Sequence, residues 1–287
     1  MALRCGIVGL PNVGKSTLFN ALSDAGADAA NYPFCTVEPN VGVVPVPDER
    51  LDRIAEMVEV PEKIPTSIEF VDIAGLVEGA SRGEGLGNQF LSQIREVDAI
   101  VHVVRCFEDD QISHVAGSVD PRRDVEVIET ELQLKDLETV ENRIEKTRKP
   151  AETGVQEAKL ELACLERLET HLSEGEPART FERENETERE LLRELFLLTD
   201  KPVLYVANVA EEDLPEGNEH AETVRAIARE KNAESVVIAA GLESELATMD
   251  PEERTLFLDD LGLEESGLHR LVRAAHELLG LITFFTY

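Results

Sequence analysis

The chain has 287 residues, enough for one large domain or two smaller ones. Hydrophobic residues make up 42% of it, so a core can form, while 59 acidic residues against 28 basic ones give a formal net charge of -31. A surface this acidic repels nucleic acid at ordinary salt, and a salt-rich cytoplasm would explain it. The local basic patch at Arg143, Lys146, Arg148 and Lys149 is better explained as the solvated face of a helix.

The cysteines and the apolar segments exclude several other classes of protein. Cys5, Cys35, Cys106 and Cys164 lack C-x-x-C spacing, which argues against a structural zinc site or a disulfide framework. No apolar run approaches the ~20 residues that cross a bilayer. The N-terminus continues directly into an apolar strand, so we expect no signal peptide. We therefore expect a cytoplasmic protein with reduced thiols and no membrane partner.

The first motif lies at residues 9–17, which read G-L-P-N-V-G-K-S-T and match the phosphate-binding pattern G-x-x-x-x-G-K-S. An apolar run at residues 4–8 predicts a buried strand before it, and residues 17–22 predict a helix after it. Glycines let the backbone curl round a phosphate, and the amides and the helix N-terminus attract its charge. The plainer alternative is a glycine-rich turn with a surface lysine. The candidate phosphate-binding residues are Asn12, Val13, Gly14, Lys15, Ser16 and Thr17.

Two later segments predict a magnesium site beside this loop. Residues 41–46 predict an edge strand, Asp48 can cap a helix, and residues 67–72 alternate like a strand that ends at Asp72. The Asp72 carboxylate can hold Mg²⁺ through a water, and the Gly75 amide can meet a γ-phosphate. The hydroxyls of Ser16 and Thr36 complete the expected metal ligands. An acid that simply closes a strand, and a loop threonine without a role, are the alternatives.

The middle of the chain changes character after a helix at residues 86–97 and a buried strand at residues 99–104. Between Asp124 and Leu198, two apolar stripes separated by charged residues predict an antiparallel coiled-coil hairpin that turns near residues 150–154, followed by a polar connection at residues 173–188. The hairpin is either a structural appendage or an arm that binds a partner. The predicted domains are residues 1–123 and 199–282, which form one nucleotide-binding domain, and the inserted residues 124–198.

Strands and helices alternate again after the hairpin. The expected strands are residues 202–208 and 235–239, and the expected helices are residues 219–231, a helix that begins at residue 250, and residues 266–281. This pattern predicts an α/β fold with a mostly parallel sheet covered on both faces.

Asn208, Val209 and Glu211 stand where guanine-binding switch proteins carry N-K-x-D. Glutamate is one methylene longer than aspartate, and the stacking lysine stem is missing. Because Asn208 can serve both the amine and a ring nitrogen of adenine, we expect ATP to be preferred over GTP; the alternative is a strand-end asparagine without a role.

Four segments together resemble the YchF family of Obg-like ATPases: G-L-P-N-V-G-K-S, N-Y-P-F-C-T-V-E-P-N, D-I-A-G-L-V-E-G-A-S-R-G-E-G-L-G-N-Q-F and N-V-A-E. The resemblance runs over the whole chain. It implies a Ras-like P-loop nucleotide domain, an inserted helical coiled coil and a C-terminal TGS domain. It also implies ATP preference, slow hydrolysis, Mg²⁺ dependence and association with ribosomes. The sequence ends at residues 283–287, about where the TGS domain would begin, so we expect this chain to lack that domain.

The place where Ras-like enzymes carry a water-orienting glutamine holds Leu76, which cannot hydrogen-bond water. Hydrolysis is then very slow, or a partner or another residue supplies the missing group. The resemblance points to His114, with a surface-loop histidine as the alternative, whereas His102 lies in an apolar strand and is expected in the core. Lys15, Gly75 and His114 are thus the candidate catalytic residues.

The sequence therefore predicts a Mg²⁺-dependent ATPase that works as a slow nucleotide switch in translation, with the ribosome or ribosomal RNA as its expected partner. GTP is the weaker expected substrate. The alternatives are a conventional GTPase and a protein that senses nucleotide with negligible hydrolysis. The sequence does not define the oligomeric state, and a monomer is the simplest expectation.

Overall fold

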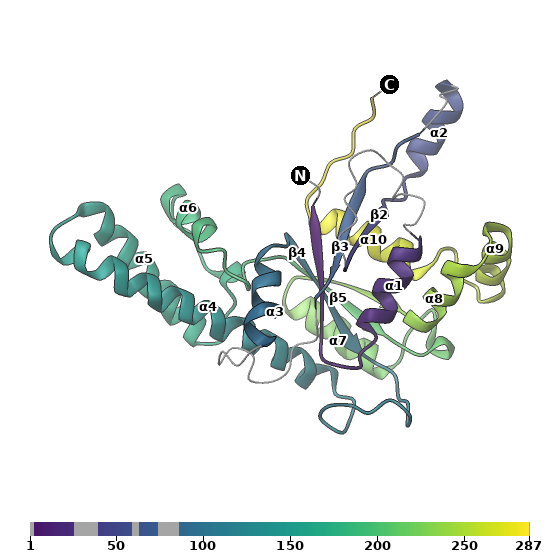
Figure 1. Ribbon diagram of the computed structural model, residues 1–287, viewed down its shortest axis with the longest axis horizontal. Coiled ribbons are helices and arrows are strands. Elements are labelled where there is room, and N and C mark those ends of the chain that lie inside the picture. The colour runs from purple at the N-terminus through teal and green to yellow at the C-terminus, as the bar shows by residue number, and fades with distance from the viewer. Residues whose placement is uncertain (1–2, 26–39, 59–62, 74–85, 287) are drawn as a thin grey trace. The chain divides into compact units, whose positions relative to one another are not determined.

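The computed structural model describes residues 3–25, 40–58, 63–73 and 86–286 (Figure 1). The chain divides into two compact units. The first contains residues 1–75, 97–124 and 203–287, and the second contains residues 76–96 and 125–202. Three predicted positions, Thr36, Gly75 and Leu76, lie outside the described residues.

The first unit is built on a six-stranded sheet in the order β2-β3-β1-β4-β5-β6. Every neighbouring pair is parallel except the pair formed by β2 and β3. The edge strand β2 ends at Pro45, whose missing N–H is tolerated only at such a position. The predicted mostly parallel α/β fold is confirmed. The strands are β1 (Arg4–Val8), β2 (Val41–Pro45), β3 (Ser67–Asp72), β4 (Ala99–Arg105), β5 (Val203–Asn208) and β6 (Glu234–Ile238).

Strand β1 lies in the middle of this sheet, where Cys5 pairs with Phe70 on one side and Ala99 on the other. All residues of β4 and β5 are buried, as expected for parallel strands that are covered on both faces. His102, in β4, is 3% exposed and its ring lies against Tyr205, so its predicted place in the core is confirmed. Because the strand order reverses between β3 and β4 around β1, a ligand crevice is expected at the carboxyl ends of these strands.

The helices of the first unit follow from capping residues and apolar spacing. Helix α1 contacts β2, β3 and α8, while α7 and α10 both pack on β5 and β6. A capping aspartate begins α9, where the Asp250 side chain accepts hydrogen bonds from the Glu252 and Glu253 amides and Pro251 fills the first turn. The helices are α1 (Lys15–Ala25), α2 (Glu49–Val58), α7 (Glu219–Glu230), α8 (Ala240–Thr248), α9 (Pro251–Asp260) and α10 (Gly267–Leu278).

Helix α8 is not among the elements that the sequence pattern predicts. Its small first residues hide the helical pattern, although Leu242 and Leu246 are both buried one turn apart. The Glu243 side chain is 1% exposed and accepts hydrogen bonds from the amides of Gly267 and Leu268, at the start of α10. This carboxylate therefore joins α8 to the N-terminus of α10.

The second unit is helical and contains the predicted hairpin. Helix α4 begins in the first unit and continues into this one, and α5 follows it after a short turn. Their apolar stripes meet in a core that includes Val140, Ile144, Leu165, Leu168 and Leu172. The helices are α3 (Leu86–Arg95), α4 (Pro121–Glu152), α5 (Gln156–Ser173) and α6 (Glu186–Leu195), with a short 3-10 turn, η3 (Ala178–Thr180), before α6.

Two details of this unit differ from the prediction. The helix continues through Pro150 and ends at Glu152, because Gly154, at φ 98°, provides the left-handed residue that stops it. The polar connection predicted at residues 173–188 contains η3 and the first turn of α6. The Asn185 side chain caps α6 by accepting from the Glu188 amide, a signal that the dense charge of this stretch concealed.

A buried carboxylate fastens the end of the second unit to α4. Asp136 accepts hydrogen bonds from the Leu198 amide at 2.7 Å, the Thr199 amide at 2.8 Å and the Thr199 hydroxyl at 2.7 Å. Burial raises the pKa of Asp136 to about 6, although these three donors act in the opposite direction. Among the described helices of both units, none is long and apolar enough to cross a membrane.

Candidate functional site

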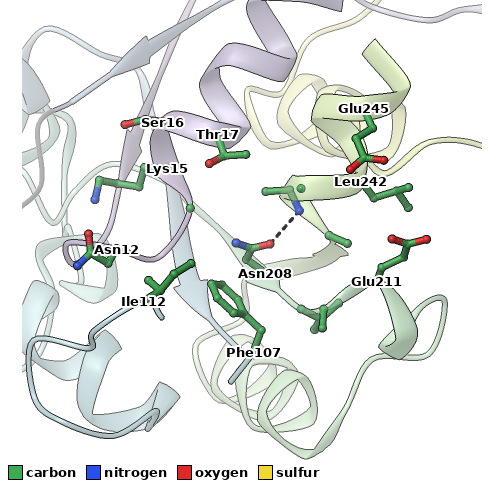
Figure 2. A pocket seen from close by; sticks show the side chains of 16 residues that line it. Asn12, Lys15, Ser16, Thr17, Phe107, Ile112, Asn208, Glu211, Leu242 and Glu245 are labelled. Carbon is green, nitrogen blue, oxygen red and sulfur yellow. Dashed lines mark hydrogen bonds between the residues drawn. The ribbon is translucent and has the colours of Figure 1, made fainter. Parts of the chain in front are cut away.

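A cleft of about 630 Å³ opens in the first unit where β1, β4, β5 and β6 end (Figure 2). Each strand contributes the segment that follows it, as expected for a ligand site in a parallel sheet. Most of the residues predicted for nucleotide binding line this cleft, namely Asn12, Gly14, Lys15, Ser16, Thr17, Asn208, Val209 and Glu211. Val13 is buried behind the loop and does not line the cleft.

The phosphate loop has the backbone conformation that its glycines allow. Gly9 and Gly14 have φ values of 156° and 97°, and Asn12 is left-handed at φ 62°. A Cβ atom at Gly14 would lie 2.3 Å from Asn208 Nδ2, so this position has no room for a side chain. Helix α1 begins at Lys15, directly after the loop. Its N-terminal amides and the loop amides therefore form a concentrated set of donors for an anion.

Lys15 is held inside this loop rather than in solvent. Its side chain donates a hydrogen bond to the Leu10 carbonyl at 2.6 Å, and the residue is 7% exposed. Burial lowers the pKa of Lys15 to about 8, while the negative charge of Asp72 acts in the opposite direction. A lysine with this pKa is mostly protonated at neutral pH and gains charge on phosphate binding only above about pH 8, because the anion stabilises its protonated form.

Asp72 and Ser16 meet beside Lys15. The Ser16 hydroxyl is 3.5 Å from Asp72 Oδ2, and Asp72 Oδ1 is buried without a hydrogen-bond partner among the residues that the structure describes. Burial raises the pKa of the Asp72 carboxyl, and the Lys15 charge and the Ser16 hydroxyl oppose this shift. A buried carboxylate oxygen without a donor, next to a hydroxyl, has the oxygen chemistry that Mg²⁺ prefers, so these residues fit the metal.

Asn208 joins three strand-end segments of the cleft. Its Nδ2 group donates to the Val13 carbonyl at 2.9 Å, and its Oδ1 accepts from the Ala240 amide at 2.9 Å (Figure 2). Each of these two atoms can form one further hydrogen bond, because the amide oxygen has two lone pairs and the amide nitrogen has two hydrogens, so the expectation that Asn208 serves adenine stays a prediction. One Nδ2 hydrogen remains for a purine ring nitrogen, and that contact does not distinguish adenine from guanine.

The rest of the cleft contains residues that sequence reasoning missed. Phe107 and Ile112 come from the connection between β4 and α4, and Leu242 and Glu245 come from α8. The side chains of Glu211 and Glu245 approach the same end of the cleft from opposite sides in Figure 2. The rule that placed Asp72 and Asn208 at strand ends also applies to residues 239–242 after β6. Phe107 and Ile112, which form the aromatic and aliphatic wall of the cleft, carry no sequence motif that predicts their position.

His114 lies in the connection between β4 and α4 but does not line the cleft. Its side chain is 4% exposed, with Nε2 at 2.8 Å from Asp124 Oδ2 and Nδ1 accepting a hydrogen bond from the Ala116 amide at 3.1 Å. The preceding residue, Ser113, is nearer the phosphate loop, because its carbonyl accepts a hydrogen bond from the Asn12 side chain at 3.1 Å. The His114 side chain is thus buried close to the phosphate loop rather than solvated at the surface.

Comparison with known proteins identifies the family. Residues 4–153 match the family described as 50S ribosome-binding GTPase. The whole chain is 54% identical to the protein named ribosome-binding ATPase YchF from Bacillus subtilis (strain 168), and it covers 78% of that protein. The chain belongs to the YchF family. The ribosome-binding ATPase YchF of Escherichia coli O157:H7 is likewise 54% identical over 286 residues, with 78% of its length covered.

A solved structure agrees with this family assignment. The Schizosaccharomyces pombe YchF GTPase superposes on the chain with a TM-score of 0.85 at 38% identity, covering 96% of this chain and 75% of the other. The Ras-like nucleotide domain expected for the family is therefore present. The printed names differ in the nucleotide, because the bacterial proteins are called ATPases and the yeast protein a GTPase.

Proposed function

We propose that this YchF-family chain is a Mg²⁺-dependent P-loop ATPase that prefers ATP to GTP. The observation that carries the proposal is that Val209 and Glu211 line the cleft beside Asn208. Val209 and Glu211 replace the lysine and aspartate with which guanine-binding switches stack on the base and accept its two N–H groups. A guanine base therefore loses its discriminating contacts, whereas the adenine amine can still donate to the second lone pair of Asn208 Oδ1.

The phosphate end supplies the chemistry of hydrolysis. Lys15 and the loop amides stabilise the charge that develops on the transferred phosphoryl group. Ser16 and Asp72 hold Mg²⁺, and the sequence adds Thr36 as a further ligand and the Gly75 amide as a contact of the γ-phosphate. Bound Mg²⁺ neutralises charge on the phosphate oxygens. Release of Asp72 and the segment after it, once the γ-phosphate leaves, gives the protein two states and makes it a switch.

Hydrolysis is slow because Leu76 cannot orient the attacking water. His114 supplies the missing group when its loop moves toward the nucleotide. The hydrogen bond between Asn12 and the Ser113 carbonyl already holds this loop beside the phosphate loop, so the movement required is short. Comparing phosphate release by the parent and by His114→Ala tests this role. The variant is expected to be slower by about tenfold or more. Equal rates would remove His114 from the mechanism.

The ribosome is the partner that we propose for this chain. The bacterial relatives are named ribosome-binding ATPases, and the matched family is described as 50S ribosome-binding. With a net charge of -31, the chain needs a local surface rather than its overall charge to meet ribosomal RNA or protein. Co-sedimentation with purified ribosomes in ATP and in ADP measures both the association and its nucleotide dependence. If the protein is absent from the ribosome pellet in both ATP and ADP, the ribosome is not its partner.

Competition between ATP and GTP for one site tests the base preference. The double variant Val209→Lys, Glu211→Asp restores the N-K-x-D pattern, and we expect it to raise the ratio of GTP to ATP affinity by about tenfold or more. Glu212→Asp is the matched control, since it shortens the neighbouring acid, which does not line the cleft. A parent protein that already prefers GTP would favour the conventional GTPase. ATP binding without phosphate release would favour a nucleotide sensor.

A further inference from the structure

A buried histidine–aspartate pair lies in the connection between β4 and α4. His114 Nε2 is 2.8 Å from Asp124 Oδ2, and each side chain is only 4% exposed. Asp124 belongs to the first turn of α4, whereas His114 lies in the loop before it. The proposed function uses His114 but assigns no role to this carboxylate.

The hydrogen bonds of the ring define its tautomer. Because the Ala116 amide donates to His114 Nδ1 at 3.1 Å, that nitrogen carries a lone pair and no proton. The proton of a neutral ring then lies on Nε2 and is donated to Asp124. The basic nitrogen of His114 is therefore Nδ1, and Asp124 occupies the opposite side of the ring.

Asp124 is itself fixed in place. Its second oxygen, Oδ1, accepts hydrogen bonds from Arg123 Nε at 3.0 Å and Arg123 Nη2 at 2.8 Å. The Arg123 side chain also donates to the carbonyl and the hydroxyl of Ser118. One carboxylate oxygen thus faces an arginine and the other faces the histidine, so the carboxylate cannot turn away from the ring without losing charge-assisted bonds.

The loop has other supports besides this pair. Arg105 is 2% exposed and donates to the carbonyls of Phe107 and Ile112 at 3.0 Å each, and its guanidinium stacks on the Phe107 ring. The Asn12 side chain holds Ser113 from the phosphate loop. A buried ionisable pair is a costly way to fasten a loop that already has these bonds, so its placement beside a candidate water-activating residue calls for a chemical role.

We propose that Asp124 is the positioning residue of His114, and that the two form a dyad in which the carboxylate keeps the proton on Nε2 and leaves Nδ1 to accept a proton from water. This inference rests on the proposed ATPase function. When the loop exchanges the Ala116 hydrogen bond for the attacking water, a water proton moves to Nδ1. The water oxygen bonds to the γ-phosphorus while the bond to the departing ADP oxygen breaks, and the proton then passes to phosphate. Asp124 stabilises the positive ring during this interval.

The tautomer is the first readout, because it needs no hydrolysis. Nitrogen-15 spectra of histidine-labelled protein report which ring nitrogen of His114 carries the proton. We expect the Nε2-protonated form in the parent and its loss in Asp124→Asn, whose amide can donate to Nε2. Glu126→Gln, an exposed acid two residues further along α4, is the matched control and is expected to keep the parent spectrum. A parent ring protonated on Nδ1 would overturn the proposal before any variant is made.

Single-turnover hydrolysis of ATP is the second readout. Asp124→Asn is expected to slow the chemical step by about tenfold or more while ATP affinity changes less than about twofold. Asp124→Glu, which retains the carboxylate, is expected to recover part of the rate. Combining Asp124→Asn with His114→Ala is expected to cost no more than His114→Ala alone, because both changes disable one unit.

The two variants separate failure of the dyad from failure of the proposed mechanism. If His114→Ala is slow but Asp124→Asn is as fast as the parent, the dyad is wrong and the role of His114 stands. If His114→Ala is as fast as the parent, the role of His114 in the proposed function fails, and the dyad fails with it. Should Asp124→Asn not fold, Arg123→Gln loosens the same carboxylate from its other side and is expected to slow the chemical step without weakening ATP binding. An unchanged rate in that folded variant would also contradict the dyad.

Discussion

Nucleotide binding by this protein should take up a proton at alkaline pH, and Lys15 is the reason. Burial in the phosphate loop lowers the pKa of Lys15 to about 8 in the unliganded protein. A triphosphate next to the ammonium group restores its charge and raises its pKa on binding. Below pH 8 the lysine is already protonated, so binding needs no proton. Above pH 8 each binding event must take up a proton, and ATP affinity falls as the pH rises.

The size of the fall in ATP affinity follows from the lowered pKa of Lys15. At pH 9 about nine-tenths of Lys15 is neutral in the unliganded protein, so ATP affinity should fall by about tenfold per pH unit above 8 and binding should take up nearly one proton. The stability of the unliganded fold changes in the opposite sense. Since the folded pKa lies below the unfolded value near 10.5, the native state binds fewer protons, and Lys15 makes the fold more stable as the pH rises from about 8 to 10.5.

Calorimetric titration with ATP and Mg²⁺ in two buffers of different ionisation enthalpy measures the proton uptake directly. Lys15→Arg provides the control, because arginine stays protonated throughout this range and should remove the uptake that Lys15 causes. Equal heats in the two buffers at pH 9, with ATP affinity unchanged between pH 7.5 and 9.5, would refute the argument that burial neutralises this lysine.

Two further predictions concern the close packing around Gly14 and the buried carboxylate of Asp136. Gly14→Ala should weaken ATP binding by at least about tenfold, since its Cβ would clash with Asn208, whereas Gly262→Ala, also at positive φ but with open space around it, should leave titrations of ATP unchanged. Asp136→Asn should lower the free energy of unfolding by about 2 kcal/mol, because a carboxamide leaves a buried donor without an acceptor. Urea denaturation of this variant beside Glu141→Gln, an exposed change on the same helix, measures that loss. A midpoint shared with the parent would show that the three hydrogen bonds to Asp136 contribute little.

The phosphate loop could be predicted because its geometry is encoded locally. Gly9 and Gly14, at fixed spacing between an apolar strand and a helix, allow the positive φ angles that this loop needs, and the structure has them. Asp72 and Asn208 were placed near this loop by the rule that strands of a parallel sheet end at one edge, and both lie there. Local signals and a topological rule were sufficient for this part of the site.

The remainder depended on contacts that no short segment encodes. The engagement of Asn208 Oδ1 follows from the way β6 and α8 meet the end of β5, which brings the Ala240 amide within 2.9 Å. The partnership of His114 with Asp124 needs the whole connection between β4 and α4 to fold back on itself. Helix α6 was hidden because its apolar face is short and its surroundings are highly charged. In each case tertiary packing decided what sequence spacing left open.

Binding of purine triphosphates by the folded chain is the most direct test of the central claim, which is that the loop at residues 9–17 holds a triphosphate and the cleft beside Asn208 accepts adenine in preference to guanine. Calorimetry in Mg²⁺ buffer, with circular dichroism to establish that the protein is folded, should give one site with higher affinity for ATP than for GTP. A folded protein that releases no heat with either nucleotide would contradict the phosphate site, and higher affinity for GTP would contradict the base assignment.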